Sequence, residues 1–308
     1  MAVIRSILLR ASRSPWLADQ FRRRRFARRA VRKFMPGEDV GAALDASAKF
    51  AAERIGTVIT TLGERVSNAA EAAAVRDHYL ELLNAIQNRG LPTHISVKLS
   101  HLGLDVDKEL CAASLDTLAT RATQVGSFLW IDIEESWYVD ATLEMFRRTR
   151  AAHERVGLCL QAYLRRTAAD LESLMPLAPA IRLVKGAYRE PPEVAFPKKR
   201  DTDDAYYALG DRMLQAAVNG RAFPVFGTHD LELVERLRER ARSLGVTDTG
   251  YEFHMLYGIK PSEQRALRDR GGAVRVLISY GTHWFPWYVR RLAERPANVW
   301  FVVRSVIS

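Results

Sequence analysis

The chain has 308 residues, of which 48% are hydrophobic, an ordinary fraction for a soluble globular protein. No run of about 20 apolar residues occurs, so we do not expect an integral membrane protein. The net charge is +10, but residues 1–36 alone hold 11 Lys and Arg against one acid, Asp19. Subtracting these from the 46 Lys and Arg and the 36 Asp and Glu of the whole chain leaves 35 residues of each sign. The rest of the chain is therefore neutral and is not expected to bind nucleic acid.

The first 36 residues interleave arginines with apolar side chains such as Ile7, Trp16 and Phe26. This pattern favours one or two basic amphipathic helices, which suit an anionic membrane surface or a nucleic acid. A helix docked on the body with its basic face in water is the alternative. We divide the chain into an N-terminal helical arm, 1–52, and a main domain, 53–308. Cys111 and Cys159 have no metal-ligand spacing and are expected to be buried free thiols in a reducing cytoplasm.

After a helix at 40–52, short β-branched runs alternate with longer helical segments. Helices are predicted at 69–87, 108–124, 139–153, 167–175, 204–218, 231–243 and 261–269. Eight strands are predicted at 55–61, 93–99, 127–133, 156–162, 180–185, 223–227, 250–255 and 273–279. This alternation predicts an α/β fold, a (β/α)8 barrel with extra N-terminal helices, whose closure pairs every strand edge. A doubly wound sheet is the alternative, but no GxGxxG follows any strand.

Polar residues gather where the predicted strands end, which is where barrel enzymes place their chemistry. Basic residues outnumber acids there, so the site should prefer anionic ligands. The seven histidines show no HxH or HExxH spacing, so we expect no catalytic metal. The candidates are Glu64, Lys98, Asp132, Glu134, Gln161, Arg182, Lys185, Thr228, His229 and His254.

Two further stretches belong to this end of the barrel. The connection at 186–203 is about three times the usual length, contains three prolines, and is predicted to be a lid or a ligand-gripping loop. After the last strand, a helix is predicted to carry the adjacent Arg290 and Arg291, with Glu294 one turn beyond Arg290. Two adjacent guanidinium groups could bind a carboxylate or a phosphate, and a solvated basic face is the alternative.

Lysines on two strands leave Schiff-base chemistry open, because burial beside other cations can make a lysine nucleophilic. Lys98, however, can pair with Asp132 on the neighbouring strand, which would keep it charged. Spacing alone therefore predicts an anion-binding barrel enzyme.

The segments RLVKGAYREP at 182–191 and YGTHWFPWYVRRLAERP at 280–296 resemble the proline dehydrogenase family, in its short, monofunctional bacterial form. Further matches run along nearly the whole chain, among them LGERV at 62–66, SVKLSHLGLD at 96–105 and YEFHMLYGI at 251–259. The resemblance implies an FAD-dependent enzyme that oxidises L-proline to Δ1-pyrroline-5-carboxylate. A hydride would pass from proline C5 to flavin N5, and the electrons would then pass to a membrane quinone.

Carried over residue by residue, the resemblance assigns catalysis to Arg182, beside flavin N5, and to Asp132, paired with the cations of the site. Small residues at 186 and 187 would let the backbone approach the cofactor. The implied substrate-binding residues are Lys98, Arg290, Arg291, Tyr188, Leu183 and Leu277, with Glu64 and Glu294 bracing the arginines. The implied FAD-binding residues are Ile133, Gln161, Arg182, Lys185, Gly186, Ala187, Thr228 and His229.

The chain departs from the family pattern in one informative place. It reads RVLISYG at 275–281 where the family usually reads RxYxPYG, so Leu277 replaces a tyrosine of the substrate wall and Ser279 replaces a proline. The substrate could therefore be 4-hydroxyproline or another cyclic secondary amino acid. At position 254 the family commonly has Gln in place of His254. No dedicated general base is evident, and nearby cations would favour the neutral amine.

An enzyme that reduces a membrane quinone must visit the bilayer, and the basic arm would help it do so. We therefore expect a cytoplasmic protein that binds peripherally to the inner face of the cell membrane, without a nucleic-acid partner. Two other functions remain open. A Schiff-base lyase on the same barrel would be trapped by borohydride at Lys98 or Lys185, and a binding protein with a vestigial barrel would show no turnover.

Overall fold

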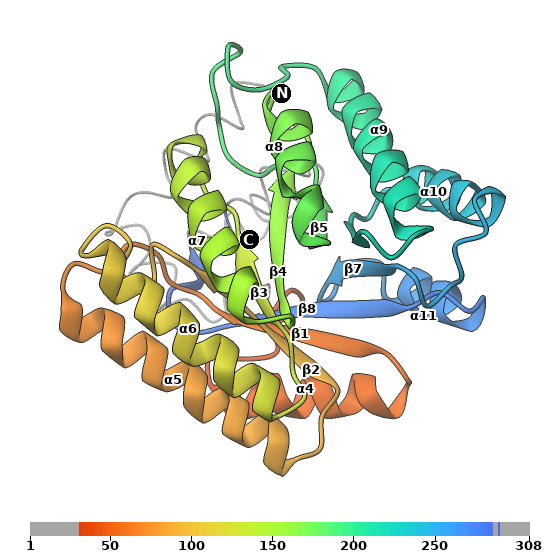
Figure 1. The fold of residues 1–308 in the computed structure, drawn as a ribbon. Coiled ribbons are helices and arrows are strands. Elements are labelled where there is room, and N and C mark those ends of the chain that lie inside the picture. Colours follow the sequence, from red (N-terminus) through yellow and green to blue (C-terminus); the bar gives the residue numbers. More distant parts are fainter. Residues whose placement is uncertain (1–30, 286–288, 290–308) are drawn as a thin grey trace, which may run out of the picture.

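The barrel is closed and all-parallel, with its eight strands paired in chain order (Figure 1). The computed structural model describes residues 31–285 and 289. The predicted (β/α)8 fold is confirmed, and each predicted strand bound lies within two residues of the observed one. The strands are β1 Gly56–Thr61, β2 Thr93–Lys98, β3 Leu129–Asp132, β4 Val156–Gln161, β5 Ala180–Val184, β6 Phe223–Gly227, β7 Glu252–Leu256 and β8 Val274–Tyr280.

Helices surround the strands on the outside of the barrel (Figure 1). Several begin where a side chain satisfies their first free N–H groups, as Asn68 does for Glu71 N and Asp107 for Leu110 N. The helices are α4 Val40–Ala52, α5 Ala69–Asn88, α6 Lys108–Gln124, α7 Val139–Ala152, α8 Thr167–Leu174, α9 Lys199–Ala217, α10 Leu231–Ser243 and α11 Pro261–Asp269, with short 3-10 turns η1 Ser136–Tyr138 and η2 Met175–Leu177.

Alternation along the strands separates two apolar regions. Outward side chains such as Ile59, Ile181 and Phe226 join the helices in the large core, whereas Val58 and Trp130 pack inside the barrel with Ala180 and Val225. The Trp130 indole needs the space left by Gly157, because a Cβ at that glycine would lie 2.5 Å from the ring. Parity along a strand therefore decides which residues can face a site inside the barrel.

The helix α4, assigned to the arm on sequence, packs into the same core as the barrel. Ala43 and Leu44 are buried in that core, and Thr57 of β1 donates a hydrogen bond to Ser47 at 2.9 Å. Val31 and Met35 are also buried, at 4% and 1% exposure. Residues 31–52 are therefore integrated with the barrel. The rest of the predicted arm, 1–30, lies outside the described residues.

The long connection after β5 is shorter than the sequence indicated, because α9 begins at Lys199 and not near residue 204. The polar start of this helix resembles a loop in sequence. Asp201 in its first turn complements the positive helix end, and Lys199 pairs with Asp203 one turn later. The connection that remains, 185–198, contacts the segments that follow β3 and β4.

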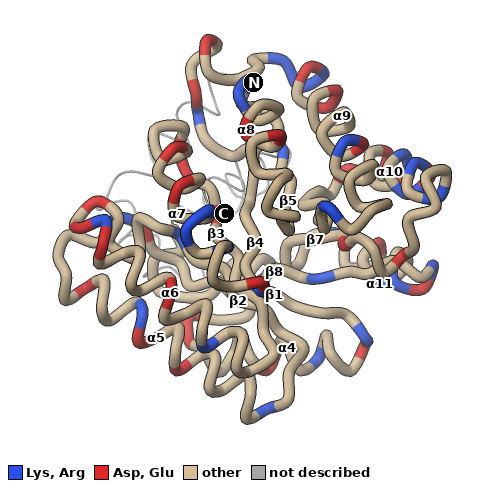
Figure 2. Tube along the Cα trace, in the orientation of Figure 1, with Lys and Arg blue, Asp and Glu red and all other residues tan. Residues whose placement is uncertain are grey.

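Acidic and basic residues are interspersed along the outer helices, as Figure 2 shows for α5, α10 and α11. Within residues 31–285, no helix is long and apolar enough to cross a membrane.

Candidate active site

Two adjoining cavities lie where the strands end, at the mouth of the barrel. The larger cavity has a volume of about 380 Å³ and includes Arg182, Lys185 and Thr228 in its wall. The smaller cavity has a volume of about 160 Å³ and includes Lys98 and Tyr188. Both are bounded by the same six residues, Asp132, Cys159, Val184, Ala187, Leu256 and Leu277. Two molecules bound in these cavities would therefore meet across a shared wall.

Arg182 is the most constrained cation of the larger cavity. Its side chain is buried, donates to Ser96 Oγ at 2.9 Å and forms an ion pair with Asp132. Its guanidinium lies 5.2 Å from the centre of the Trp130 ring, and Ser96 donates a second bond to Asp132 at 3.0 Å. One terminal nitrogen, NH1, is buried without a hydrogen-bond partner among the described residues. Arg182 is thus fixed in position and retains one donor for a ligand.

The predicted cofactor residues are divided between the two cavities. Arg182, Lys185, Gly186, Ala187, Thr228 and His229 line the larger one, whereas Ile133 and Gln161 line the smaller one. Ala187 lines both. All eight residues that the resemblance assigned to FAD therefore lie at the same end of the barrel.

The charge of Lys185 is balanced by two acids. Its ammonium lies 2.5 Å from Asp203 and 2.7 Å from Asp230, which belong to α9 and to the start of α10. Burial would raise the pKa of each aspartate, but the hydrogen bonds and positive charges of Lys185 and Lys199 together outweigh it and hold both pKa values below their usual range. This cluster fixes the backbone around the larger cavity.

Gly186 is required by its conformation and by Tyr163. Its φ is +127°, and a Cβ there would lie 2.3 Å from the tyrosine ring. The sequence argument that a small residue lets the backbone approach a ligand is therefore incomplete, because the neighbour that excludes a side chain is a ring of the protein itself.

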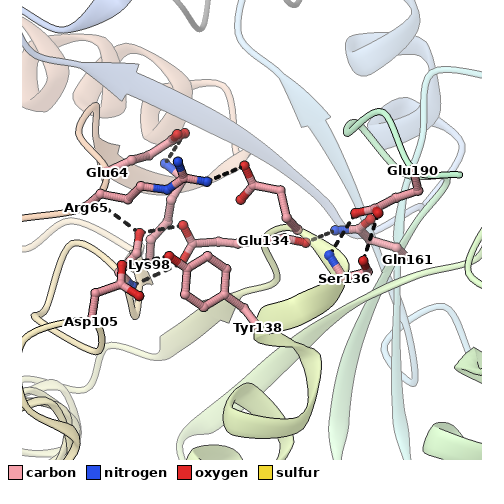
Figure 3. Close-up of polar contacts among 11 residues, drawn as sticks. Glu64, Arg65, Lys98, Asp105, Glu134, Ser136, Tyr138, Gln161 and Glu190 are labelled. Carbon is pink, nitrogen blue, oxygen red and sulfur yellow. Dashed lines mark hydrogen bonds and ion pairs between the residues drawn. The ribbon is translucent and has the colours of Figure 1, made fainter. Parts of the chain in front are cut away.

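The smaller cavity is lined by Lys98, Tyr188, Leu277 and Ser279. Lys98 lies 3.8 Å from Glu64, and Figure 3 shows both among the polar groups at the ends of β1 and β2. The predicted pairing of Lys98 with Asp132 is wrong. These two residues are opposite each other in register, but the Asp132 carboxylate turns to the buried Arg182 and Ser96.

Leu183 is a predicted substrate contact that the structure places on the wrong face. Arg182 and Val184, its neighbours in β5, line the larger cavity, so Leu183 must point outward. It is fully buried in the core between the barrel and the helices. Its backbone carbonyl accepts a hydrogen bond from Tyr206 at 3.1 Å, which ties β5 to α9.

Arg290, Arg291 and Glu294, the predicted anion clamp, lie outside the described residues. Glu64 was predicted to brace those arginines. In the described structure it forms an ion pair with Lys98.

Sequence reasoning did not give Glu134 a role, although it placed this residue at the mouth. The carboxylate is buried and accepts hydrogen bonds from Ser100 N at 3.1 Å and Ser100 Oγ at 2.5 Å. Gln161 donates to its backbone carbonyl at 2.9 Å (Figure 3). Burial raises the pKa of Glu134 to about 7. The sequence feature that could have pointed to a role for Glu134 was its position at the end of β3, two residues after Asp132.

Two contacts join loops that follow the strands. Glu190, in the connection after β5, accepts hydrogen bonds from the backbone N and the hydroxyl of Ser136, both at 2.7 Å. Arg65 pairs with Glu135 at 2.8 Å, and Figure 3 shows Arg65 beside Glu64 and Lys98. Part of the predicted lid is thus held against the turn that follows β3. Among residues 31–285, no group of three or more His, Cys, Asp or Glu could hold a metal ion.

Comparison with known proteins gives consistent matches. The sequence model of the family described as "Proline dehydrogenase" matches residues 43–304. Proline dehydrogenase 1 of Bacillus subtilis subsp. natto is 32% identical over 281 residues, covering 91% of this chain and 92% of the relative. Proline dehydrogenase of Deinococcus radiodurans is 34% identical over 281 residues, covering 90% and 89%.

Solved structures agree on the fold. Proline utilization A from Bdellovibrio bacteriovorus matches with a TM-score of 0.80 and 23% identity over 86% of this chain. A Bradyrhizobium japonicum proline utilization A mutant matches with a TM-score of 0.74 and 26% identity over 89% of this chain. The chain spans about a third of the length of each of these proteins, 32% in both cases.

Proposed function

Because the chain belongs to the proline dehydrogenase family, we propose that it oxidises L-proline to Δ1-pyrroline-5-carboxylate with a bound FAD, and that the electrons pass to a membrane quinone. The observation that carries the proposal is the pair of adjoining cavities. A substrate and a cofactor that exchange a hydride must lie in contact, and two cavities that share six wall residues provide such a contact.

The polar groups of two residues that line the larger cavity fit a flavin. Arg182 Nη1 and His254 Nδ1 are buried without a hydrogen-bond partner among the described residues, and buried polar groups in this state ordinarily await a ligand or an ordered water. The flavin, when bound, supplies the acceptor for the hydride that leaves the carbon next to the substrate nitrogen. Of the residues that would hold it, Arg182, Lys185, Gly186, Ala187, Thr228 and His229 line the larger cavity, and Ile133 and Gln161 would reach it from the adjoining smaller one.

Arg182 supplies a positive charge that is already oriented before the reaction. Asp132 and Ser96 hold the guanidinium, so no reorganisation is needed when negative charge develops beside it. Asp132 acts by fixing Arg182, and the apolar wall of Val184, Leu256 and Leu277 limits water between the two cavities.

The smaller cavity would hold the substrate. Lys98 in its wall would attract the carboxylate, together with Arg290 and Arg291, while Glu64 and Glu294 brace these cations. The same positive field would favour the neutral form of the substrate amine, whose lone pair assists departure of the hydride. Tyr188 would pack on the substrate ring.

A second substrate is favoured by two wall residues. Leu277 and Ser279 both line the smaller cavity, and Ser279 brings a hydroxyl to it. 4-Hydroxyproline, or another cyclic secondary amino acid, is therefore the alternative substrate. A Schiff-base lyase is disfavoured because both lysines are engaged in ion pairs, Lys185 with two aspartates and Lys98 with Glu64.

The test is an anaerobic visible spectrum of the purified protein supplied with FAD, before and after L-proline and then 4-hydroxyproline. We expect a flavin spectrum that proline bleaches. Bleaching by hydroxyproline alone would assign the alternative substrate. A protein that takes up no FAD and is trapped by borohydride at Lys98 or Lys185 would overturn the proposal in favour of the lyase.

A further inference from the structure

A histidine in the wall of the larger cavity has one ring nitrogen unused. His254 lies on β7, is 4% exposed, and has no hydrogen-bond partner for Nδ1 among the described residues. Its other nitrogen, Nε2, lies 3.1 Å from Glu252 Oε2. Leaving a buried ring nitrogen unpaired destabilises the protein, so a ligand in this cavity is the natural partner of Nδ1.

Glu252 fixes where the histidine proton resides. Arg275 Nε donates to both oxygens of Glu252, at 2.9 and 3.1 Å. Burial would raise the pKa of Glu252, but the His254 contact and the Arg275 charge outweigh it and hold the pKa well below its usual range. An ionised carboxylate only accepts hydrogen bonds, so Nε2 must carry the hydrogen.

The imidazole is neutral at physiological pH, because burial lowers the pKa of His254 to about 4. With the single hydrogen on Nε2, Nδ1 presents a lone pair and can only accept a hydrogen bond. Two residues that line the larger cavity thus carry complementary buried groups, a donor on Arg182 Nη1 and an acceptor on His254 Nδ1.

The ring is also held in orientation. It packs edge-on to Trp130, with centroids 5.4 Å apart, and Trp130 Nε1 donates to His94 Nδ1 at 3.3 Å. Trp130 in turn lies under Arg182. One indole therefore positions both the donor and the acceptor of the wall.

We propose that His254 accepts a hydrogen bond through Nδ1 from a ring N–H of the bound flavin, and that Glu252 is the positioning residue that selects the required tautomer. The inference rests on the proposed function. A flavin ring carries an N–H between two carbonyl groups, so it needs an acceptor for the N–H and donors for the oxygens. The wall of the larger cavity offers both.

The first experiment measures FAD affinity by quenching of flavin fluorescence, together with the visible spectrum of bound flavin. We expect H254L to raise the dissociation constant about tenfold, because it removes the acceptor from a buried site. H254Q, whose side-chain carbonyl can accept, should stay within about threefold and keep the wild-type spectrum. The dissociation constant of E252Q should lie between those of H254L and H254Q, because a side-chain amide at position 252 can pair with either tautomer of His254.

The matched control is H153L, because His153 pairs with Asp116 at 2.7 Å and belongs to neither cavity. It should leave FAD affinity unchanged. If H254L does not fold, H254Q, E252Q and the experiment below still decide the matter.

The second experiment reads the tautomer directly, by NMR of protein with 15N-labelled histidine, the residue-254 signal being the one absent from H254Q. We expect an unprotonated Nδ1 whose shift changes when FAD binds, and a mixture of tautomers in E252Q. A protonated Nδ1, or H254L binding FAD like wild type, would overturn this inference alone. Wild-type protein that binds no FAD would instead overturn the proposed function.

Discussion

The side chain on which the proposed chemistry depends most is Arg182, because its neighbours fix it from three sides. Asp132 and Ser96 bind one terminal nitrogen, and the Trp130 ring supports the guanidinium plane. A lysine keeps the positive charge but lacks the planar guanidinium that lies over the Trp130 ring while one of its nitrogens binds Asp132 and Ser96.

We predict that Arg182→Lys lowers the rate of flavin reduction by about 10²- to 10³-fold, the usual cost of removing an oriented electrostatic group. The measurement is anaerobic stopped-flow reduction with L-proline. Arg212→Lys is the control, since Arg212 also pairs with an acid, Glu172, but lies on the surface, where the rate should not change. A wild-type rate in R182K would argue against a role at the reacting atoms.

A second residue-scale prediction concerns Glu134, whose pKa is raised by burial from 4.5 to about 7. The folded state therefore holds a proton that the unfolded state releases above pH 4.5, so stability falls as pH rises from 4.5 through 7. Glu134→Gln removes this loss of stability, because glutamine carries no charge at either pH. Its amide can still accept a hydrogen bond from Ser100 N and donate one to Ser100 Oγ.

We expect the free energy of unfolding of E134Q to exceed that of wild type by about 1–3 kcal/mol at pH 8, and to show no such gain at pH 4.5. Urea denaturation at the two pH values measures this difference. A difference that does not vary with pH would mean that the Glu134 carboxylate is not destabilised by burial.

At the scale of elements, the connection after β5 is held in place by contacts at both ends. Gly186 begins it against Tyr163, and Glu190 joins it to Ser136 in η1. Leu164 and Ala195 form an isolated antiparallel bridge, and Arg165 lies 4.8 Å from the Phe196 ring. This connection is therefore a fixed wall of the site in the described structure.

Gly186→Ala should disrupt that wall. The new Cβ would overlap the Tyr163 ring at a φ of +127°, so we expect a loss of about 1–3 kcal/mol of stability and weaker FAD binding. Gly220→Ala is the control, because Gly220 also has a positive φ, +66°, but nothing lies within 4 Å of its added Cβ. Thermal unfolding and FAD titration compare the two, and equal effects would exclude the Tyr163 contact as the cause.

Strand positions were predictable because β-branched runs recur with helical segments between them, and barrel closure follows from eight such units. The alternation of side chains along a strand could have corrected the prediction that Leu183 contacts the substrate, because Arg182 and Leu183 are adjacent in β5 and must point to opposite faces. The choice of ionic partners could not be predicted. Lys98 and Asp132 share a register position, and only the packing of Trp130 and Arg182 shows where the carboxylate turns.

At the scale of the whole molecule, the excess positive charge belongs to residues 1–36, of which 31–35 include the buried Val31 and Met35. We predict that deleting residues 1–30, which spares that packing, abolishes co-sedimentation with anionic vesicles. Flavin reduction by proline should be unchanged. Vesicle binding that survives the deletion would refute a membrane role for this segment.

The direct pairing of β1 with β8 also has a consequence for biosynthesis. Gly56 lies opposite Arg275, so the first strand leaves the ribosome more than two hundred residues before its partner. Until then the backbone N–H and C=O groups along one edge of β1 have no strand to pair with, and α4 lacks its contacts with β8. Contacts this distant in sequence slow folding and expose nascent chains to aggregation. The same closure that leaves the mature barrel without a free edge thus makes the newly synthesised chain dependent on its last strand.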